Sequence, residues 1–323
     1  MDSGAALNEE RTGGAAQAFR ASGRLEIPFV LQNAAGVSNG DTAVVDLRLP
    51  DSVPPQPFYR AAAGVPYGFL VRDRYGTLLP AQVLEVTKDR SVTTDPRGFP
   101  DFHDGCQVRV AFHPESPLPP LGTEAFVLEQ LPTAEQEVAE AGSARGREDA
   151  GGVYLENERL SVRVGGDGRV DLEDLQNGVA VEDVLVLTDS GDIGDLYNYS
   201  PPPEDLVVSS REAEVLGVEL LAAGPVLSSA RLELELPIPS ALADDRQRRS
   251  RERCGLAVVL TFTLSGGGTA LEVDIDLDNT ATDHRLRALV RQPHGVPVAA
   301  ASVAQAAFTV EQRSAVPAPV PVE

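Results

Sequence analysis

The sequence predicts an all-β protein made of antiparallel strands. Short runs rich in Val, Leu and Phe alternate apolar and polar residues with a period of two, and Pro, Gly, Asn and Asp separate them. No helical pattern is long enough to form the crossover connection that a pair of parallel strands requires. These two observations favour antiparallel β-sandwiches over a parallel sheet.

The first part of the chain predicts a small antiparallel β-sandwich domain over residues 23–133. Residues 1–22 are small and polar without periodicity, which is typical of a disordered leader. Six strand-like segments follow, at residues 24–33, 41–50, 67–73, 78–87, 106–114 and 124–132.

A change of composition marks the boundary to a second domain over residues 151–323. Residues 134–150 are rich in Ala, Glu, Gly and Arg with hardly any bulky apolar side chains, which predicts a linker because its burial would stabilise little. The glycines of GGDG at 165–168 supply the positive φ angles of a tight hairpin. Strand-like segments lie at residues 153–164, 169–175, 179–191, 213–221, 225–239, 256–267, 269–281 and 284–293.

Charge and cysteine content exclude several classes of protein. The chain has 49 acidic and 27 basic side chains, a net charge of −22, so phosphate backbones and anionic lipid surfaces would be repelled. We therefore expect neither nucleic acid nor membrane as a partner. No apolar run approaches the roughly 20 residues of a membrane span, and no signal peptide is visible, which predicts a cytoplasmic protein. Cys106 and Cys254 are predicted to be separate buried thiols.

The segment LEVDIDLDN predicts a strand with two different faces. Apolar side chains alternate with aspartates, and a strand points alternate side chains to opposite sides. We expect the apolar face to lie on the core and the acidic face to be solvated, or alternatively to bind a cation. The apolar set is Val273, Ile275 and Leu277, and the acidic set is Asp274, Asp276 and Asp278.

General motifs identify no catalytic residue and no metal ligand in this chain. The histidines lack the spacing of a metal-binding motif. The sequence also has no nucleophile elbow, no phosphate-binding loop and no dinucleotide fingerprint. The four histidines are His103, His113, His284 and His294.

One long connection, DSGDIGDLYNYSPPPED at residues 189–205, is unusual in composition. It contains four Asp, two Gly, two Tyr and three consecutive Pro, whereas ordinary connections are shorter. Tyrosine offers a ring that can stack on a sugar and a hydroxyl that donates or accepts a hydrogen bond. The loop is therefore either a ligand-contacting loop or a rigid packing loop whose aspartates cap turns.

Several segments, taken in order, resemble one enzyme family. VYLENERLSVRV, SGDIGDLYNYSPP, DDRQRRSRE and DNTATDHRLRALV are similar to the region downstream of the catalytic domain in bacterial glycoside hydrolase family 38 α-mannosidases and mannosylglycerate hydrolases. VRDRYGTLLPAQVLEV and FPDFHDGCQVRVAF resemble the small β-domain that precedes that region. The resemblance covers residues 23–313 and implies that residues 151–323 are part of a truncated β-supersandwich of the galactose mutarotase-like kind.

The resemblance implies a role for the tyrosine-containing loop. In the family, a zinc ion and an aspartate nucleophile in an amino-terminal barrel hydrolyse α-mannosides with retention, and this chain has neither barrel nor zinc ligands. A family tyrosine reaches from the loop to that active site. Tyr197 resembles this residue, and Tyr199, two positions on, is the alternative substrate contact in a complete enzyme. We expect the shape of the loop to depend on Asp192, Asp195 and Asn198.

Two basic segments allow alternative interpretations. Residues 244–254 contain five Arg against three acids and form either a solvated hairpin or a set of guanidinium partners for carboxylates of the loop or of the absent barrel. Farther on, alternation places Asp283, Arg285 and Arg287 on one strand face, where we expect salt bridges.

The resemblance implies a non-catalytic carboxy-terminal portion of an α-mannosidase that supports the barrel and lends it a loop. Its partners would be an α-mannoside or another carbohydrate and, if the polypeptide is split rather than truncated, a barrel-bearing chain encoded separately. We expect such a portion to be inactive alone and to expose apolar surface. The alternative is a free-standing carbohydrate-binding β-sandwich module.

Overall fold

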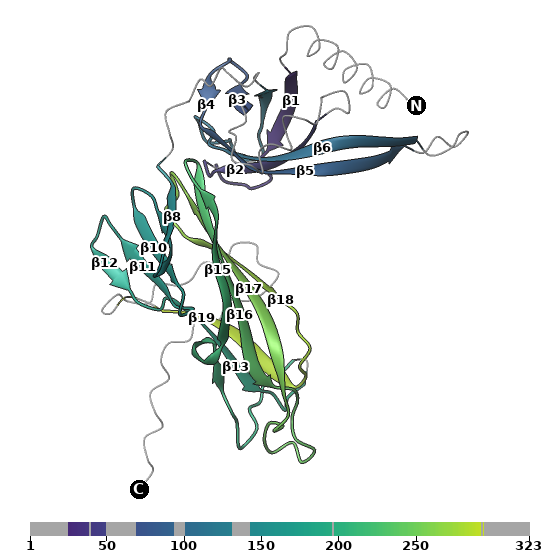
Figure 1. The fold of residues 1–323 in the computed structure, drawn as a ribbon, viewed down its shortest axis with the longest axis vertical. Helices are drawn as coiled ribbons and strands as arrows, with labels where there is room; N and C mark the ends of the chain where they lie inside the picture. The colour runs from purple at the N-terminus through teal and green to yellow at the C-terminus, as the bar shows by residue number, and fades with distance from the viewer. Residues whose placement is uncertain are drawn as a thin grey trace.

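The computed structural model describes residues 25–38, 40–49, 69–93, 101–130, 143–195, 197–291 and 293. Its strands pair in antiparallel ladders, and the described residues contain one short 3-10 turn, Ser210–Glu212 (Figure 1). The predicted all-β class is therefore confirmed. The predicted leader, residues 1–22, and residues 134–142 of the predicted linker lie outside the described residues. No helix in the described ranges is long and apolar enough to cross a membrane.

The first group of strands forms two facing sheets, with strand orders β1-β7-β3-β4 and β2-β6-β5. The strands are β1 (Leu25–Gln32), β2 (Ala43–Leu49), β3 (Phe69–Asp73), β4 (Leu78–Leu79), β5 (Ala81–Thr93), β6 (Asp101–Phe112) and β7 (Thr123–Gln130). Alternate side chains of both sheets enter one core.

Three phenylalanines lie within that first core. Phe112 and Phe126 are buried, with ring centroids 5.0 Å apart in an edge-to-face arrangement, and Phe29 packs 5.7 Å from each of them. Such ring pairs are favourable beyond the area they bury. This aromatic cluster joins the two sheets.

The second group of strands forms three sheets, with orders β12-β11-β10-β9-β8, β14-β13-β19 and β15-β16-β17-β18. The strands are β8 (Arg145–Asp149), β9 (Gly152–Glu156), β10 (Leu160–Gly165), β11 (Val170–Asp174), β12 (Val179–Val181), β13 (Leu185–Gly191), β14 (Val208–Ser209), β15 (Glu214–Ala223), β16 (Leu227–Pro239), β17 (Arg253–Ser265), β18 (Glu272–Leu277) and β19 (His284–Val290).

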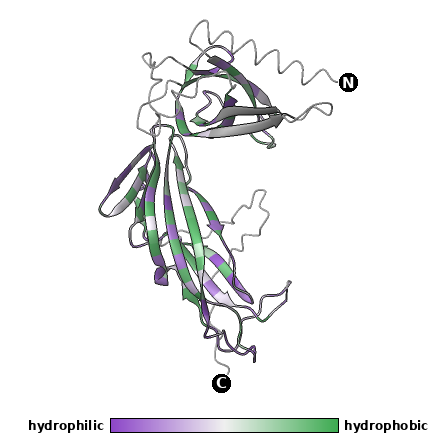
Figure 2. Cartoon of the chain, turned by 45° about the vertical axis from the view of Figure 1, so that its right-hand side comes forward, coloured by the Kyte–Doolittle hydropathy of each residue, from purple (hydrophilic) through white to green (hydrophobic). Residues whose placement is uncertain are grey.

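The core of the second group is mainly aliphatic. The long strands β16 and β17 pair over their full lengths and alternate buried with less buried side chains. Figure 2 shows the same alternation as green and purple bands along the strands. The inward side chains include Leu232, Leu234, Leu236, Leu256, Val258, Leu260 and Phe262.

Strand β8 lies inside the segment that the sequence analysis assigned to the linker. Arg145–Asp149 pairs with β9 along its whole length. The segment was misread because its polar side chains carry no alternating apolar signal, whereas backbone hydrogen bonds to a neighbouring strand need none.

Strand β18 differs from its predicted burial. Val273, Ile275 and Leu277 pair with buried residues of β17, so they share the inner face of the sheet. They are nevertheless 37%, 38% and 41% exposed, because β18 is the last strand of its sheet. The prediction of a covered core face is therefore wrong at this edge.

The structure tests the predicted GGDG hairpin and the predicted burial of the two cysteines. Gly168, in the turn between β10 and β11, has φ of +79°, as the predicted hairpin requires. Cys254 is half-buried against the second core, so it is less covered than expected. The side chain of Cys106 lies outside the described residues.

A small contact joins the two groups of strands. The side-chain oxygen of Gln82, on β5, accepts hydrogen bonds of 3.0 Å from the backbone N–H groups of both Val226 and Leu227. Ala111 packs against the same two residues in a small apolar cluster. The start of β16 is thus attached to the first group.

Candidate functional site

The loop between β13 and β14, here called the tyrosine loop (residues 191–205), is held by its own aspartates. The Oδ1 atom of Asp192 accepts hydrogen bonds from the N–H groups of Gly194 and Ser200, at 2.8 and 3.0 Å. Asp195 accepts in the same way from Tyr197 and Asn198, at 2.9 and 2.8 Å. Each carboxylate closes a turn of the backbone.

The same hydrogen bonds determine the ionisation of Asp195. The backbone N–H of Tyr197, followed by that of Asn198, lowers the pKa of the Asp195 carboxyl below its usual range. A carboxylate stabilised in this way remains charged at neutral pH and keeps the turn closed.

The two tyrosines have different surroundings. Tyr197 is 90% exposed at the tip of the loop, so its ring and hydroxyl are free of packing. Tyr199 is half-buried, with the Arg285 guanidinium 4.5 Å from its ring centroid and its hydroxyl donating to Ser190 Oγ at 3.4 Å. Of the two predicted contacts, Tyr197 is therefore the accessible one, and Tyr199 anchors the loop to β13 and β19.

Close approach of backbone segments within the loop requires glycine. A Cβ atom on Gly194 would fall onto the carbonyl oxygen of Asn198, well inside van der Waals contact. Asn198 is exposed and closes the second turn through its backbone N–H. The two turns can therefore stack only with glycine at position 194.

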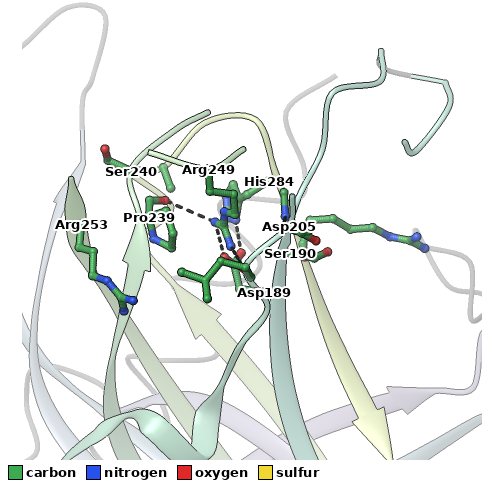
Figure 3. A network of polar contacts seen from close by, with 12 residues as sticks. Asp189, Ser190, Asp205, Pro239, Ser240, Arg249, Arg253 and His284 are labelled. Carbon is green, nitrogen blue, oxygen red and sulfur yellow. Dashed lines mark hydrogen bonds and ion pairs between the residues drawn. The ribbon is translucent and has the colours of Figure 1, made fainter. Parts of the chain in front are cut away.

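A buried ionic network lies beneath the loop (Figure 3). Asp189, at the end of β13, forms an ion pair of 2.5 Å with Arg249, and the two side chains are 0% and 1% exposed. The other carboxylate oxygen contacts Nδ1 of His284, on β19. Because buried charges are unfavourable unless they are well paired, this arrangement requires all three side chains together.

Arg249 connects three parts of the chain through this network. Its guanidinium donates to the carbonyl oxygen of Leu206, at 3.1 Å, and to that of Pro239, at 3.4 Å. Leu206 follows the tyrosine loop, and Pro239 ends β16. The ion pair therefore attaches the loop to the hairpin of residues 240–252, which joins β16 to β17 and is here called the arginine hairpin.

His284 is held on both sides of its ring. Its Nδ1 atom faces Asp189, and its Nε2 atom lies 3.0 Å from Oδ1 of Asn279. The same Asn279 oxygen accepts from the N–H of Ala281, which fixes it as an acceptor. The ring is therefore held in place at both of its nitrogens.

Exposed contacts add a second attachment between the arginine hairpin and the tyrosine loop. Arg246 donates to the carbonyl oxygen of Ile193 at 3.3 Å and lies 3.6 Å from the carboxylate of Asp283. The backbone N–H of Glu204 donates to Gln247 at 2.9 Å. Both predicted alternatives for the arginine segment therefore apply: most of the hairpin is exposed, and Arg249 pairs with a carboxylate at the base of the loop.

The predicted salt-bridged face of β19 is only partly formed. Asp283 precedes the strand with a φ of +52° and faces Arg246 rather than its strand neighbours. Arg285 and Arg287 lie opposite Ser190 and Thr188 in the ladder. The sequence analysis assigned no individual role to His284 or Arg249. The one local feature that could have pointed to Arg249 was the cluster of arginines in an otherwise acidic chain.

A pocket formed by residues outside the tyrosine loop is a second candidate site. It has a volume of about 510 Å³, and charged side chains alone line it. Two ion pairs cross it, Arg163 with Asp171 at 3.1 Å and Arg211 with Asp183 at 2.6 Å. It lacks an aromatic ring on which a sugar could stack, so the tyrosine loop is the better candidate for a sugar contact.

The described residues do not fit a metal centre. No three His, Cys, Asp or Glu side chains among them come together to hold an ion. Both ring nitrogens of His284 are already engaged.

Two solved structures share the fold. An α-mannosidase from Enterococcus faecalis V583 matches 82% of this chain with a TM-score of 0.63 and 20% sequence identity. A glycosyl hydrolase family 38 protein from Enterococcus faecalis matches 80% with a TM-score of 0.61 and 21% identity. The matched parts are 31% and 32% of those proteins, so this chain spans about a third of their length.

These matches confirm, at the level of fold, the expected correspondence with part of such an enzyme. No protein-family model matches the sequence, and no match was found among curated proteins. This chain therefore combines a fold shared with an α-mannosidase and a tyrosine loop that exposes Tyr197.

Proposed function

We propose that this chain is a non-catalytic portion of an α-mannosidase-type glycoside hydrolase. The tyrosine loop would complete a sugar site whose reacting groups lie on a catalytic barrel. Support comes from the fold shared with an α-mannosidase and a family 38 protein over about a third of their length. We infer the substrate class, an α-mannoside, from that likeness.

The exposure of Tyr197 is the observation that carries this proposal. Its ring is 90% exposed, and its backbone N–H donates to Asp195 at 2.9 Å. A backbone that is fixed in advance loses less conformational freedom when a ligand binds. Tyr197 would then stack on a sugar ring or share a hydrogen bond with a sugar hydroxyl.

The other acidic groups of the site have structural roles in this proposal. Asp189 is sealed between Arg249 and His284, and Asp192 is occupied by backbone N–H groups. Neither is free to act as nucleophile or acid. The chain would therefore position the substrate while the barrel performs the chemistry.

Hydrolysis by an assembled enzyme tests the proposal. We would search the DNA flanking this reading frame for a barrel, express both parts together and measure release of nitrophenol from 4-nitrophenyl α-mannoside. We expect activity with wild type and a loss of about tenfold or more in kcat/KM with Tyr197→Ala.

An exposed tyrosine elsewhere provides the matched control. Tyr75, in the first group of strands, is 76% exposed and far in sequence from the tyrosine loop. Tyr75→Ala should retain full activity. Equal activity of wild type and Tyr197→Ala would contradict the proposal, as would an assembled enzyme that does not cleave the mannoside.

The accessibility of Tyr197 also favours a second candidate, a free-standing carbohydrate-binding module. The ring is exposed in this chain by itself, so a sugar could reach it without a barrel. Calorimetric titration of the chain with methyl α-mannoside separates the two. Saturable binding that Tyr197→Ala abolishes and Tyr75→Ala preserves would support the module, and the absence of binding would contradict it.

A further inference from the structure

Strand β18 presents a bare edge within the described part of the chain. It pairs with β17 on one side and is the terminal strand of its sheet, as Figure 1 shows. On the other side, every second residue of an antiparallel strand points its N–H and C=O groups away from its partner. Such a row of unpaired groups is a template for one more strand.

The apolar face of this edge is continuous with a buried core. Ile275 lies opposite Leu260, which is 3% exposed, and Val273 lies opposite Phe262, which is fully buried. The β18 side chains are more than one-third exposed although they share this inner face. An added strand with apolar side chains on that face would extend the core outward.

The opposite face of β18 is acidic. Glu272, Asp274 and Asp276 alternate with the apolar side chains. Asp274 and Asp276 have no basic partner among the described residues. Partial burial, together with the charges of Asp41 and Asp274, raises the pKa of Glu272, as expected for crowded carboxyl groups.

A second copy of this chain is a poor occupant of the edge. Pairing β18 with another β18 places its aspartates against those of the copy, and like charges on facing strands are destabilising. Each chain also has a net charge of −22, which opposes close approach. A strand with basic side chains on this face would instead be attracted.

We propose that the edge of β18 binds an extended polypeptide strand in which apolar and basic side chains alternate. Backbone hydrogen bonds would supply affinity, the apolar side chains would cover Val273, Ile275 and Leu277, and the basic ones would face Asp274 and Asp276. This site lies on a different strand from the tyrosine loop and does not depend on the proposed hydrolase function.

Labelled peptides test the proposal by fluorescence anisotropy. The probes are a capped heptapeptide of alternating lysine and valine, its counterpart with glutamate in place of lysine, and a block peptide with the composition of the first. We expect saturable binding of the alternating lysine peptide only. Asp274→Lys/Asp276→Lys should weaken it by about tenfold, because two attractive charge pairs become repulsive, and should favour the glutamate peptide.

A matched variant separates local pairing from general attraction. Asp244→Lys/Asp245→Lys changes the net charge equally, at exposed positions of the arginine hairpin, and should leave binding unchanged. Ile275→Lys, which alters the apolar face alone, should also weaken binding of the alternating lysine peptide. Circular dichroism establishes that each variant is folded.

Three results would overturn the proposal. The first is no binding to wild type, and the second is equal binding of the alternating and block peptides. The third is a dimer, seen by sedimentation, that Ile275→Lys dissociates, because it would identify a second copy as the occupant. Failure of mannoside hydrolysis would leave the peptide result unaffected, so the two proposals fail separately.

Discussion

Two ion pairs, one in each group of strands, differ in how completely they exclude water. In the first group, Arg72 lies 3.0 Å from Glu129, and the two side chains are 29% and 8% exposed. In the second group, Arg249 and Asp189 are sealed, and a histidine completes the network. The first pair joins neighbouring strands of one sheet, whereas the second joins a loop, a hairpin and two strands.

The difference shows which part of the fold depends on specific polar contacts and which depends on apolar packing. An aromatic cluster packs between the two sheets of the first sandwich, so we expect the fold there to depend less on its ion pair. Among the described residues, the loop end of the second sandwich has no such cluster, and long connections meet there. A sealed charge network has few alternative arrangements, because any displacement leaves a buried charge without its partner.

The largest expected effect comes from breaking the sealed pair. Arg249→Ala should lower the free energy of unfolding by about 3–5 kcal/mol, because Asp189 is left buried with an incomplete set of partners. Glu129→Ala, in the more open pair, should lower it by about 1 kcal/mol. Urea unfolding followed by circular dichroism measures both.

A double-mutant cycle sharpens the comparison. The coupling energy between Asp189 and Arg249 should exceed that between Arg72 and Glu129 by about 1 kcal/mol or more. Equal coupling in the two cycles would show that burial does not distinguish the pairs.

Crowding within the tyrosine loop gives the next largest effect. Gly194→Ala should destabilise the chain by about 1–3 kcal/mol, because the new methyl group overlaps the Asn198 carbonyl and forces the turns apart. In the first group, Gly36→Ala meets no atom within contact distance and should change the free energy of unfolding much less. Amide chemical shifts should change at residues 192–200 in Gly194→Ala alone.

Two turn aspartates allow a comparison by pH. Burial acts to raise the pKa of Asp73, but hydrogen bonds from the backbone N–H groups of Thr77 and Tyr75 outweigh it and lower the pKa. Backbone hydrogen bonds lower that of Asp195 as well. A carboxyl with a lowered folded pKa stabilises the fold above its unfolded pKa, and this contribution is lost as the pH falls through the folded value.

Carboxyl-carbon NMR titration measures this directly. Both aspartates should titrate below the usual range, and both turns should stay closed under mildly acidic conditions. Titration of Asp195 at or above its usual pKa would show that its turn is open in solution.

The smallest effect is expected at the loop tip. Tyr197→Ala should change the free energy of unfolding by less than about 0.5 kcal/mol, because the side chain is exposed. Tyr199→Ala should cost about 1 kcal/mol, because it removes the ring beneath Arg285. Similar losses for the two variants would mean that Tyr197 packs against the protein.

Much of the fold could be predicted from the sequence, because alternating apolar residues indicate a strand with one buried face. The long strands β16 and β17 carry this signal clearly, as in RLELELPIP. Strand β8 does not, since its pairing rests on backbone groups. The exposure of β18 could not be predicted either, because alternation reveals a face but not whether another element covers it.

The sequence also predicted part of the candidate site, namely the features that depend on local composition. Composition identified residues 189–205, and Asp192 and Asp195 accept the backbone hydrogen bonds that a turn-capping aspartate can make. The network beneath depends on residues about 60 and 95 positions from Asp189, namely Arg249 and His284. A single sequence contains no local pattern that pairs such distant residues.

Hydrogen exchange in the tyrosine loop most directly tests the claim that the sealed pair holds the loop in place for a ligand. The amides of Tyr197, Asn198 and Ser200 should be protected in wild type, because each donates to an aspartate carboxylate. Arg249→Ala should abolish this protection, whereas Glu129→Ala should leave it intact. Protection that survives in Arg249→Ala would contradict the claim and would show that the loop holds its shape without the ion pair.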